Sequence, residues 1–318
     1  MVIFLGKMTT TYAQDFERAG AYNNFIVEEC NKVYDKNNNY ISYAVHSKSA
    51  NKVAMQLRSV IKQLERSINK IEKMPPFKGD VKFRNEALAV LKLELQTFNV
   101  DHSNAVKLKE ASEDSYIAME KYYKAEEMAN KKLREAYKRF DKAQEDFAKK
   151  NDIEITSDMS AAAQKREQTS EMIAKVSKYS RAIYLSSFRV SKAKAGFLDA
   201  MEQKNPALVE RKRQELLAAA KMESAKLDTI AKAFDDDNYK AATVEYVKYN
   251  LLKADGDYKE LAALMKNINK LSQEEVEKYN AIIQEMNETG KALSDKMNET
   301  QEELLKNHVP EPEESTDI

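Results

Sequence analysis

The sequence contains few residues that end helices. Among 318 residues there are six glycines and five prolines, and tryptophan is absent. Proline removes a helical hydrogen bond and glycine weakens helices, so their scarcity removes the usual interruptions of helical structure. Charged residues make up 33% of the chain and apolar residues 42%, a composition typical of long helices that can still form a core. We therefore predict an all-α fold.

The sequence also lacks the residue spacings of common catalytic and metal sites. Cys30 is the only cysteine, so no internal disulfide can form, and the histidines His46, His102 and His308 lie far apart. No CxxC, HxxxH, ExxH or glycine-rich phosphate loop occurs. We interpret Cys30 as a buried helical thiol and His46 as a histidine at a helix end. The sequence thus predicts no catalytic residue, no metal site and no cofactor, and we expect the protein not to be an enzyme.

No charge of one sign dominates, because 52 basic residues face 52 acidic ones. This balance argues against a uniformly basic protein that wraps nucleic acid, so we expect no nucleic-acid partner. No stretch of the sequence approaches the roughly 20 apolar residues of a membrane-spanning helix. Nothing in the sequence indicates an oligomeric state.

A stripe of aromatic and large apolar side chains recurs at helical spacing between residues 112 and 150. Its members fall on two seven-residue registers offset by three, which places them on one helix face: Tyr116, Tyr123 and Tyr137, then Met119, Leu133, Phe140 and Phe147. Glu126 and Asn130 interrupt the stripe. Because a partner of similar length must cover such a helix, we predict an elongated antiparallel multi-helix bundle with coiled-coil-like long helices. We expect one such bundle over residues 14–309, followed by a disordered acidic tail over residues 310–318.

Capping and helix-breaking residues predict where the helices end. Met74-Pro-Pro-Phe-Lys-Gly-Asp80 predicts a tight corner, and Asn205-Pro206 and Ser272-Gln-Glu-Glu275 each predict a helix start. The run Asp35-Lys-Asn-Asn-Asn39 is expected to interrupt the first helix, whereas residues 238–268 are expected to form one helix.

The first residues resemble the end of a secretory signal peptide. Val2 to Leu5 are apolar, and the small residues Thr11 and Ala13 precede a polar stretch that begins at Gln14. The simplest interpretation is a remnant over residues 1–13 whose true beginning lies upstream of Met1, with cleavage before Gln14. We therefore expect an exported protein that is periplasmic, on the outer surface or secreted.

The stretch Tyr43-Ala-Val-His-Ser-Lys-Ser-Ala50, together with the corner at residues 74–80, resembles a family of uncharacterised exported helical proteins. These are the leptospiral-type surface proteins, also seen in Bacteroidetes-like bacteria, and the likeness extends over roughly residues 40–150. The resemblance implies an envelope or secreted location and supplies no activity. Members of this family often look lipid-anchored, and this sequence departs from that pattern because Cys30 lies in no lipid-attachment context.

One stretch, from Met172 to Leu198, contains no acidic residue. Its basic residues are Lys175, Lys178, Arg181, Arg189, Lys192 and Lys194, interleaved with aromatic residues. Three interpretations stay open. In the first, the basic residues pair with acidic residues of neighbouring helices, for instance between Glu274 and Glu303. In the second, the helix binds an acidic protein or glycan. In the third, the helix contacts a membrane surface.

These observations lead to an expectation of function. We expect a non-enzymatic exported or surface helical protein that binds or scaffolds a macromolecular partner. The alternative is a membrane-active helical protein, acting by peripheral membrane binding or pore formation, that uses the basic helix over residues 172–198.

Overall fold

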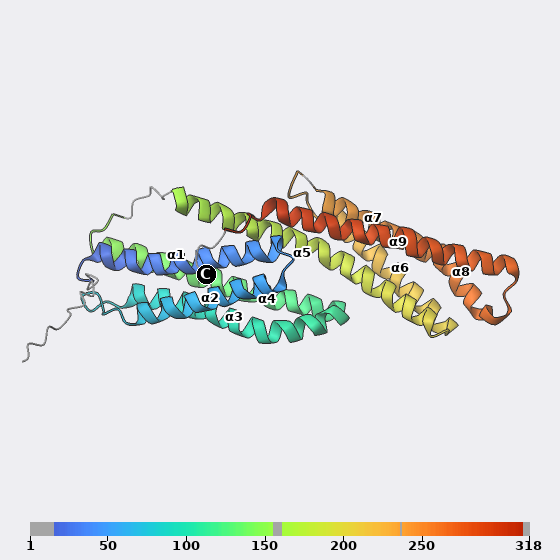
Figure 1. Ribbon diagram of the computed structural model, residues 1–318, viewed down its shortest axis with the longest axis horizontal. Helices are drawn as coiled ribbons and strands as arrows, with labels where there is room; N and C mark the ends of the chain where they lie inside the picture. Colours follow the sequence, from blue (N-terminus) through green and yellow to red (C-terminus); the bar gives the residue numbers. More distant parts are fainter. Residues whose placement is uncertain (1–15, 155–160, 236, 314–318) are drawn as a thin grey trace, which may run out of the picture. The chain divides into compact units, whose positions relative to one another are not determined.

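The computed structural model describes residues 16–154, 161–235 and 237–313, and it leaves the side chains of residues 99–114 and 161–163 undescribed. The expected signal-peptide remnant at residues 1–13 and the last five residues of the expected tail lie outside these ranges. Within them the fold is all-α, as predicted, with nine α-helices, one 3₁₀-helix and no strand. The α-helices, labelled in Figure 1, are α1 (Ala19–His46), α2 (Ala50–Glu72), α3 (Lys82–Asp114), α4 (Tyr116–Lys150), α5 (Ala161–Glu202), α6 (Pro206–Thr229), α7 (Asn238–Asp255), α8 (Asp257–Leu264) and α9 (Gln273–His308). The 3₁₀-helix η1 (Met265–Lys270) lies between α8 and α9 in the chain.

Backbone contacts divide the chain into two compact units. Unit 1 comprises Met1–Tyr40, Ala54–Asp101 and Glu127–Met159, and unit 2 comprises the remaining residues, 41–53, 102–126 and 160–318. Helix α4 therefore contributes to both units, and the division falls directly after Glu126, the first polar interruption of its apolar stripe. The single bundle over residues 14–309, its elongation and its coiled-coil character stay predictions.

Unit 1 is a helical bundle whose core is rich in stacked aromatic rings. Its buried residues come from α1 to α4 and from the corner between α2 and α3. Phe147 of α4 packs against Tyr22, Phe77 and Phe83, with ring centroids 5.1–5.5 Å apart. Aromatic pairs at such distances add to the free energy gained by burial alone, so these rings fix α1 and α4 against the corner.

The predicted corner at residues 74–80 is confirmed. Phe77 and Asp80 exchange two backbone hydrogen bonds, at 2.9 and 2.8 Å, and Gly79 adopts a φ of +85° that side chains disfavour. The Asp80 carboxylate accepts a hydrogen bond from the backbone amide of Lys82 at 2.9 Å, so it caps the start of α3.

Unit 2 is a second bundle, in which α5 contacts α6, α7 and α9 (Figure 1). Its core includes Phe197 of α5 stacked on Tyr258 of α8 at 5.1 Å, together with Leu216 of α6 and Val247 of α7, all four fully buried. Residues 41–46 at the end of α1 also belong to this unit. There, His46 closes the helix as expected, and its Nε2 lies 2.8 Å from the carbonyl oxygen of Val309.

Two sequence-based predictions about helix boundaries are wrong. Helix α1 runs without interruption through residues 35–39, which include three asparagines. Asparagine costs a helix only about 0.5 kcal/mol per residue, and the packed side chains of Val33 and Ile41 flank the run. The helix expected over residues 238–268 is instead broken at Gly256, whose φ and ψ are −106° and −102°. The break turns α8 so that Tyr258 and Leu261 become fully buried.

Candidate functional site: a cationic face on helix α5

Five of the six basic residues in the acid-free stretch share one side of α5. Lys175 and Lys178 are exposed, whereas Arg181, Arg189 and Lys192 are half-buried. The apolar residues Ile183 and Val190 on the opposite side are fully buried in the core of unit 2. We call the five basic residues the cationic face.

The two arginines of the cationic face are paired with acids from other helices. The Arg189 guanidinium donates to Glu223 Oε1 of α6 at 3.1 Å, and the Arg181 guanidinium pairs with Glu126 of α4 at 2.5 Å. Glu223 is almost completely buried, with 1% of its side chain exposed, whereas Glu126 is 31% exposed. Arg189 thus neutralises a carboxylate in the core, and Arg181 forms a half-exposed pair.

Aromatic rings support four of the five cations. Arg181 lies over the ring of Tyr123 at 4.6 Å, Arg189 over Tyr116 at 4.3 Å, Lys175 over Phe234 at 4.7 Å and Lys192 over Phe188 at 5.5 Å. A cation within about 6 Å of a ring centroid is attracted to the face of the ring, yet keeps its full charge. The rings therefore position these groups without neutralising them.

Lys194, the sixth basic residue of the stretch, does not belong to the cationic face. Sixteen residues separate it from Lys178, which at 3.6 residues per turn places the two side chains about 160° apart around α5. Its ammonium lies so close to Gly290 of α9 that a Cβ at that glycine would be 2.9 Å away. Burial lowers the pKa of Lys194. Lys194 therefore packs against α9 inside unit 2.

The acidic last helix is not the partner of the cationic face. Among the described residues, no ion pair joins α9 to the five residues of the cationic face. The acids of α9 pair elsewhere, for example Glu285 with Lys253 at 2.6 Å and Asp295 with Lys291 at 2.7 Å. Helix α9 instead places Ile282, Met286, Met297 and Leu304 in the core of unit 2. Removal of α9 would destabilise unit 2 whatever the charge of α9. Deletion of α9 therefore cannot reveal whether its acidic residues pair with the cationic face.

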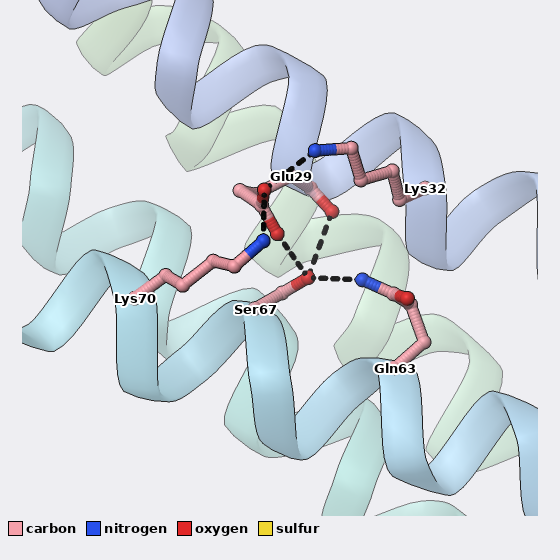
Figure 2. Close-up of polar contacts among 5 residues, drawn as sticks. All are labelled: Glu29, Lys32, Gln63, Ser67 and Lys70. Atoms are coloured by element: carbon pink, nitrogen blue, oxygen red, sulfur yellow. Dashed lines mark hydrogen bonds and ion pairs between the residues drawn. The ribbon is translucent and has the colours of Figure 1, made fainter. Parts of the chain in front are cut away.

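A second polar cluster, in unit 1, was not predicted from the sequence. Glu29 of α1 is buried, with 1% of its side chain exposed, and accepts from Lys32 at 2.6 Å and from Lys70 of α2 at 2.9 Å. Figure 2 shows both ammonium groups converging on this carboxylate, while the Ser67 hydroxyl lies 2.9 Å from its second oxygen. Burial opposes ionisation, but the three hydrogen bonds outweigh it and lower the pKa of Glu29. The spacing of Glu29 and Lys32 is visible in the sequence, but Lys70 is brought close only by the packing of α1 on α2.

The single cysteine of the chain, Cys30, lies on α1 in unit 1. Cys30 is a free thiol, and burial raises its pKa to about 12, so it is not a thiolate at neutral pH. In the described ranges, no three acidic, histidine or cysteine side chains are grouped so as to hold a metal ion.

None of the described helices combines the length and the apolar character needed to cross a membrane. Comparisons of the chain with protein-family models, with curated proteins and with solved structures found no match.

Proposed function

We propose that this is a non-enzymatic exported or surface helical protein that binds an acidic macromolecule, either a protein or a glycan, through the cationic face of α5. The observation that carries the proposal is the surplus of positive charge on that face. Arg181 and Arg189 each have an acidic partner, whereas Lys175, Lys178 and Lys192 have no ion pair among the described residues. Like charges three or four residues apart repel one another, so an external polyanion would stabilise this arrangement.

The ring contacts support the same proposal. Lys175 and Lys192 each lie over an aromatic ring, so part of their conformational freedom is already lost before a partner binds. Such preorganisation lowers the entropic cost of association.

Substitution of the three lysines tests the proposal. We expect the full-length K175Q/K178Q/K192Q variant to lose most of its binding to poly-glutamate or chondroitin sulfate, two model polyanions. The matched control is K232Q/K248Q/K259Q, which removes the same charge from exposed positions elsewhere in unit 2. Binding of the unmodified protein should weaken between 50 and 150 mM salt, because screening shortens the reach of exposed charges to about 8 Å. Equal binding by the two triple variants, or no binding at low salt, would contradict the proposal.

The alternative function is binding at a membrane surface by the same helix. The half-buried rings of Tyr184 and Phe188, stacked at 5.6 Å beside Lys192, support it, because aromatic rings beside basic residues suit the interface of an anionic bilayer. Phosphatidylserine vesicles form the third arm of the experiment. Binding to the vesicles alone, lost in the lysine triple variant, would favour this alternative.

Export of the protein would be accompanied by cleavage of its first residues. If Thr11-Tyr-Ala13 precedes a cleavage site, mass spectrometry of the native protein should find a chain that begins at Gln14. Detection of an intact Met1 would rule out this cleavage.

A further inference from the structure

Unit 1 carries a shallow pocket over the buried Glu29 cluster. The pocket has a volume of about 330 Å³, and the rings of Phe16 and Phe25 line it together with charged residues of α1, of α2 and of the position that follows α2. This volume lies at the lower end of the range typical of small-molecule sites. The two rings pack edge to face at 5.2 Å and present an apolar wall.

The buried carboxylate holds two lysine ammonium groups side by side at this pocket. Lys32 and Lys70 donate to the same oxygen, Glu29 Oε1, at 2.6 and 2.9 Å, so their nitrogens lie within a few ångströms of each other. An ammonium has three N–H donors, and both side chains are 49% exposed, which leaves donors free for a ligand. Both carboxylate oxygens of Glu29 already accept hydrogen bonds, because Ser67 donates to Oε2 at 2.9 Å and accepts in turn from Gln63 at 3.0 Å.

The charge of the pocket selects the ligand class. Its ionisable residues are the lysines Lys32, Lys70 and Lys73 and the glutamates Glu28 and Glu29, which leave one surplus positive charge. A monoanion would balance that charge, and a carboxylate can accept hydrogen bonds from two adjacent ammonium groups. Aromatic rings beside the cations favour an aromatic body on the same ligand.

From this geometry we propose that the pocket at Phe16, Phe25, Lys32 and Lys70 binds a small aromatic monocarboxylate. The carboxylate bridges the ammonium groups of Lys32 and Lys70, and the aromatic body packs on the two phenylalanine rings. Glu29 acts as a positioning residue that keeps the two lysines together. This site lies in unit 1 and is independent of the cationic face in unit 2.

The test uses 2-naphthoate as the probe and isothermal titration calorimetry of the full-length protein. We expect a dissociation constant of about 1 mM or tighter, given the modest binding energy available to a ligand of this size. The neutral 2-naphthalenemethanol has the same aromatic body and should bind at least about tenfold more weakly, because it forms no charge-assisted hydrogen bonds. Inorganic phosphate should bind weakly, because it lacks the apolar body.

Variants locate the site. The K32Q/K70Q variant should lose about tenfold or more in affinity for 2-naphthoate. The control K62Q changes an exposed lysine of α2 outside the pocket and should bind 2-naphthoate like the unmodified protein. Because K32Q/K70Q leaves the buried Glu29 without its cations and can lower stability, K73Q serves as a second variant that keeps the Glu29 hydrogen bonds. It should weaken binding about threefold through the lost surplus charge. The proposal would be overturned by the absence of binding at 10 mM probe, by equal binding of the neutral analogue, or by unchanged affinity in both pocket variants.

Discussion

The hydroxyl of Tyr137 donates a hydrogen bond of 2.6 Å to Glu94 Oε1 within the core of unit 1. Glu94 is only 7% exposed, and no hydrogen-bond partner is found for its Oε2 among the described residues. Burial raises the pKa of Glu94 to about 7, and the hydrogen bond from Tyr137 offsets only part of that shift. Unit 1 therefore contains a carboxyl group that titrates near neutral pH.

This titration makes stability depend on pH. Between about pH 4.5 and 7 the folded protein keeps the proton of Glu94 while the unfolded chain has lost it, so the folded state binds more protons. Its contribution to the free energy of unfolding therefore falls as pH rises through this window, by roughly 3 kcal/mol in total. Urea unfolding at pH 5, 6, 7 and 8 should show this decrease in the unmodified protein.

Substitution identifies Glu94 as the source of this pH dependence. The E94Q variant, which cannot ionise, should show a much flatter profile between pH 5 and 8. E65Q, at an exposed glutamate of α2, should retain the slope of the unmodified protein. The same slope in E94Q and in the unmodified protein would contradict the assignment.

The two arginine pairs of the cationic face should differ in their effect on stability. The R189Q variant leaves Glu223 in the core with only the longer contact to Lys226 at 3.6 Å. Because an uncompensated buried charge is costly, we expect a loss of about 2–3 kcal/mol, reduced from the fully buried case by the partial exposure of Arg189. The matched R181Q variant breaks a half-exposed pair and should cost about 0.5–1 kcal/mol. Thermal unfolding compares them directly, and equal losses would show that Arg189 does not stabilise Glu223.

The start of α9 should depend on its capping box. The Ser272 hydroxyl accepts from the Glu275 amide at 3.3 Å, and the Glu275 carboxylate accepts from the Ser272 amide at 2.7 Å. The S272A variant should lose about 1 kcal/mol, and hydrogen exchange should accelerate in the first turn of α9. The S272N variant keeps a capping oxygen and should retain most of the protection.

Gly290 and Lys194 should be energetically coupled. Alanine suits a helix better than glycine by up to about 1 kcal/mol, but its Cβ at position 290 would lie 2.9 Å from the Lys194 ammonium and 3.4 Å from Tyr249 Cε1. We expect G290A to be close to neutral or destabilising in the unmodified protein. In a K194A background the same change should be more favourable by about 0.5–1 kcal/mol. If the effects of G290A and K194A on the free energy of unfolding were additive, the absence of a side chain at position 290 would not depend on Lys194.

The sequence by itself determined the fold class and several helix boundaries. The corner at residues 74–80, the Asn205-Pro206 start of α6 and the capping box at Ser272 were all predicted correctly. They depend on backbone conformation and on hydrogen bonds between residues a few positions apart, which local sequence specifies. The same local argument was wrong for the asparagine run of α1, because packing on both sides of the run outweighs a weak local preference.

Only the tertiary structure decided which partners the charged residues have. The sequence located the basic residues of α5, but nothing local indicated that Glu126 and Glu223, rather than the acids of α9, would lie beside the arginines. The local sequence also did not show that the side of α5 carrying Lys194 faces the core, or that Lys70 would reach Glu29. The physical reason is that an ion pair between helices depends on how the helices pack and rotate against each other. That arrangement is set by burial of apolar surface summed over the whole core rather than by the residues of the pair.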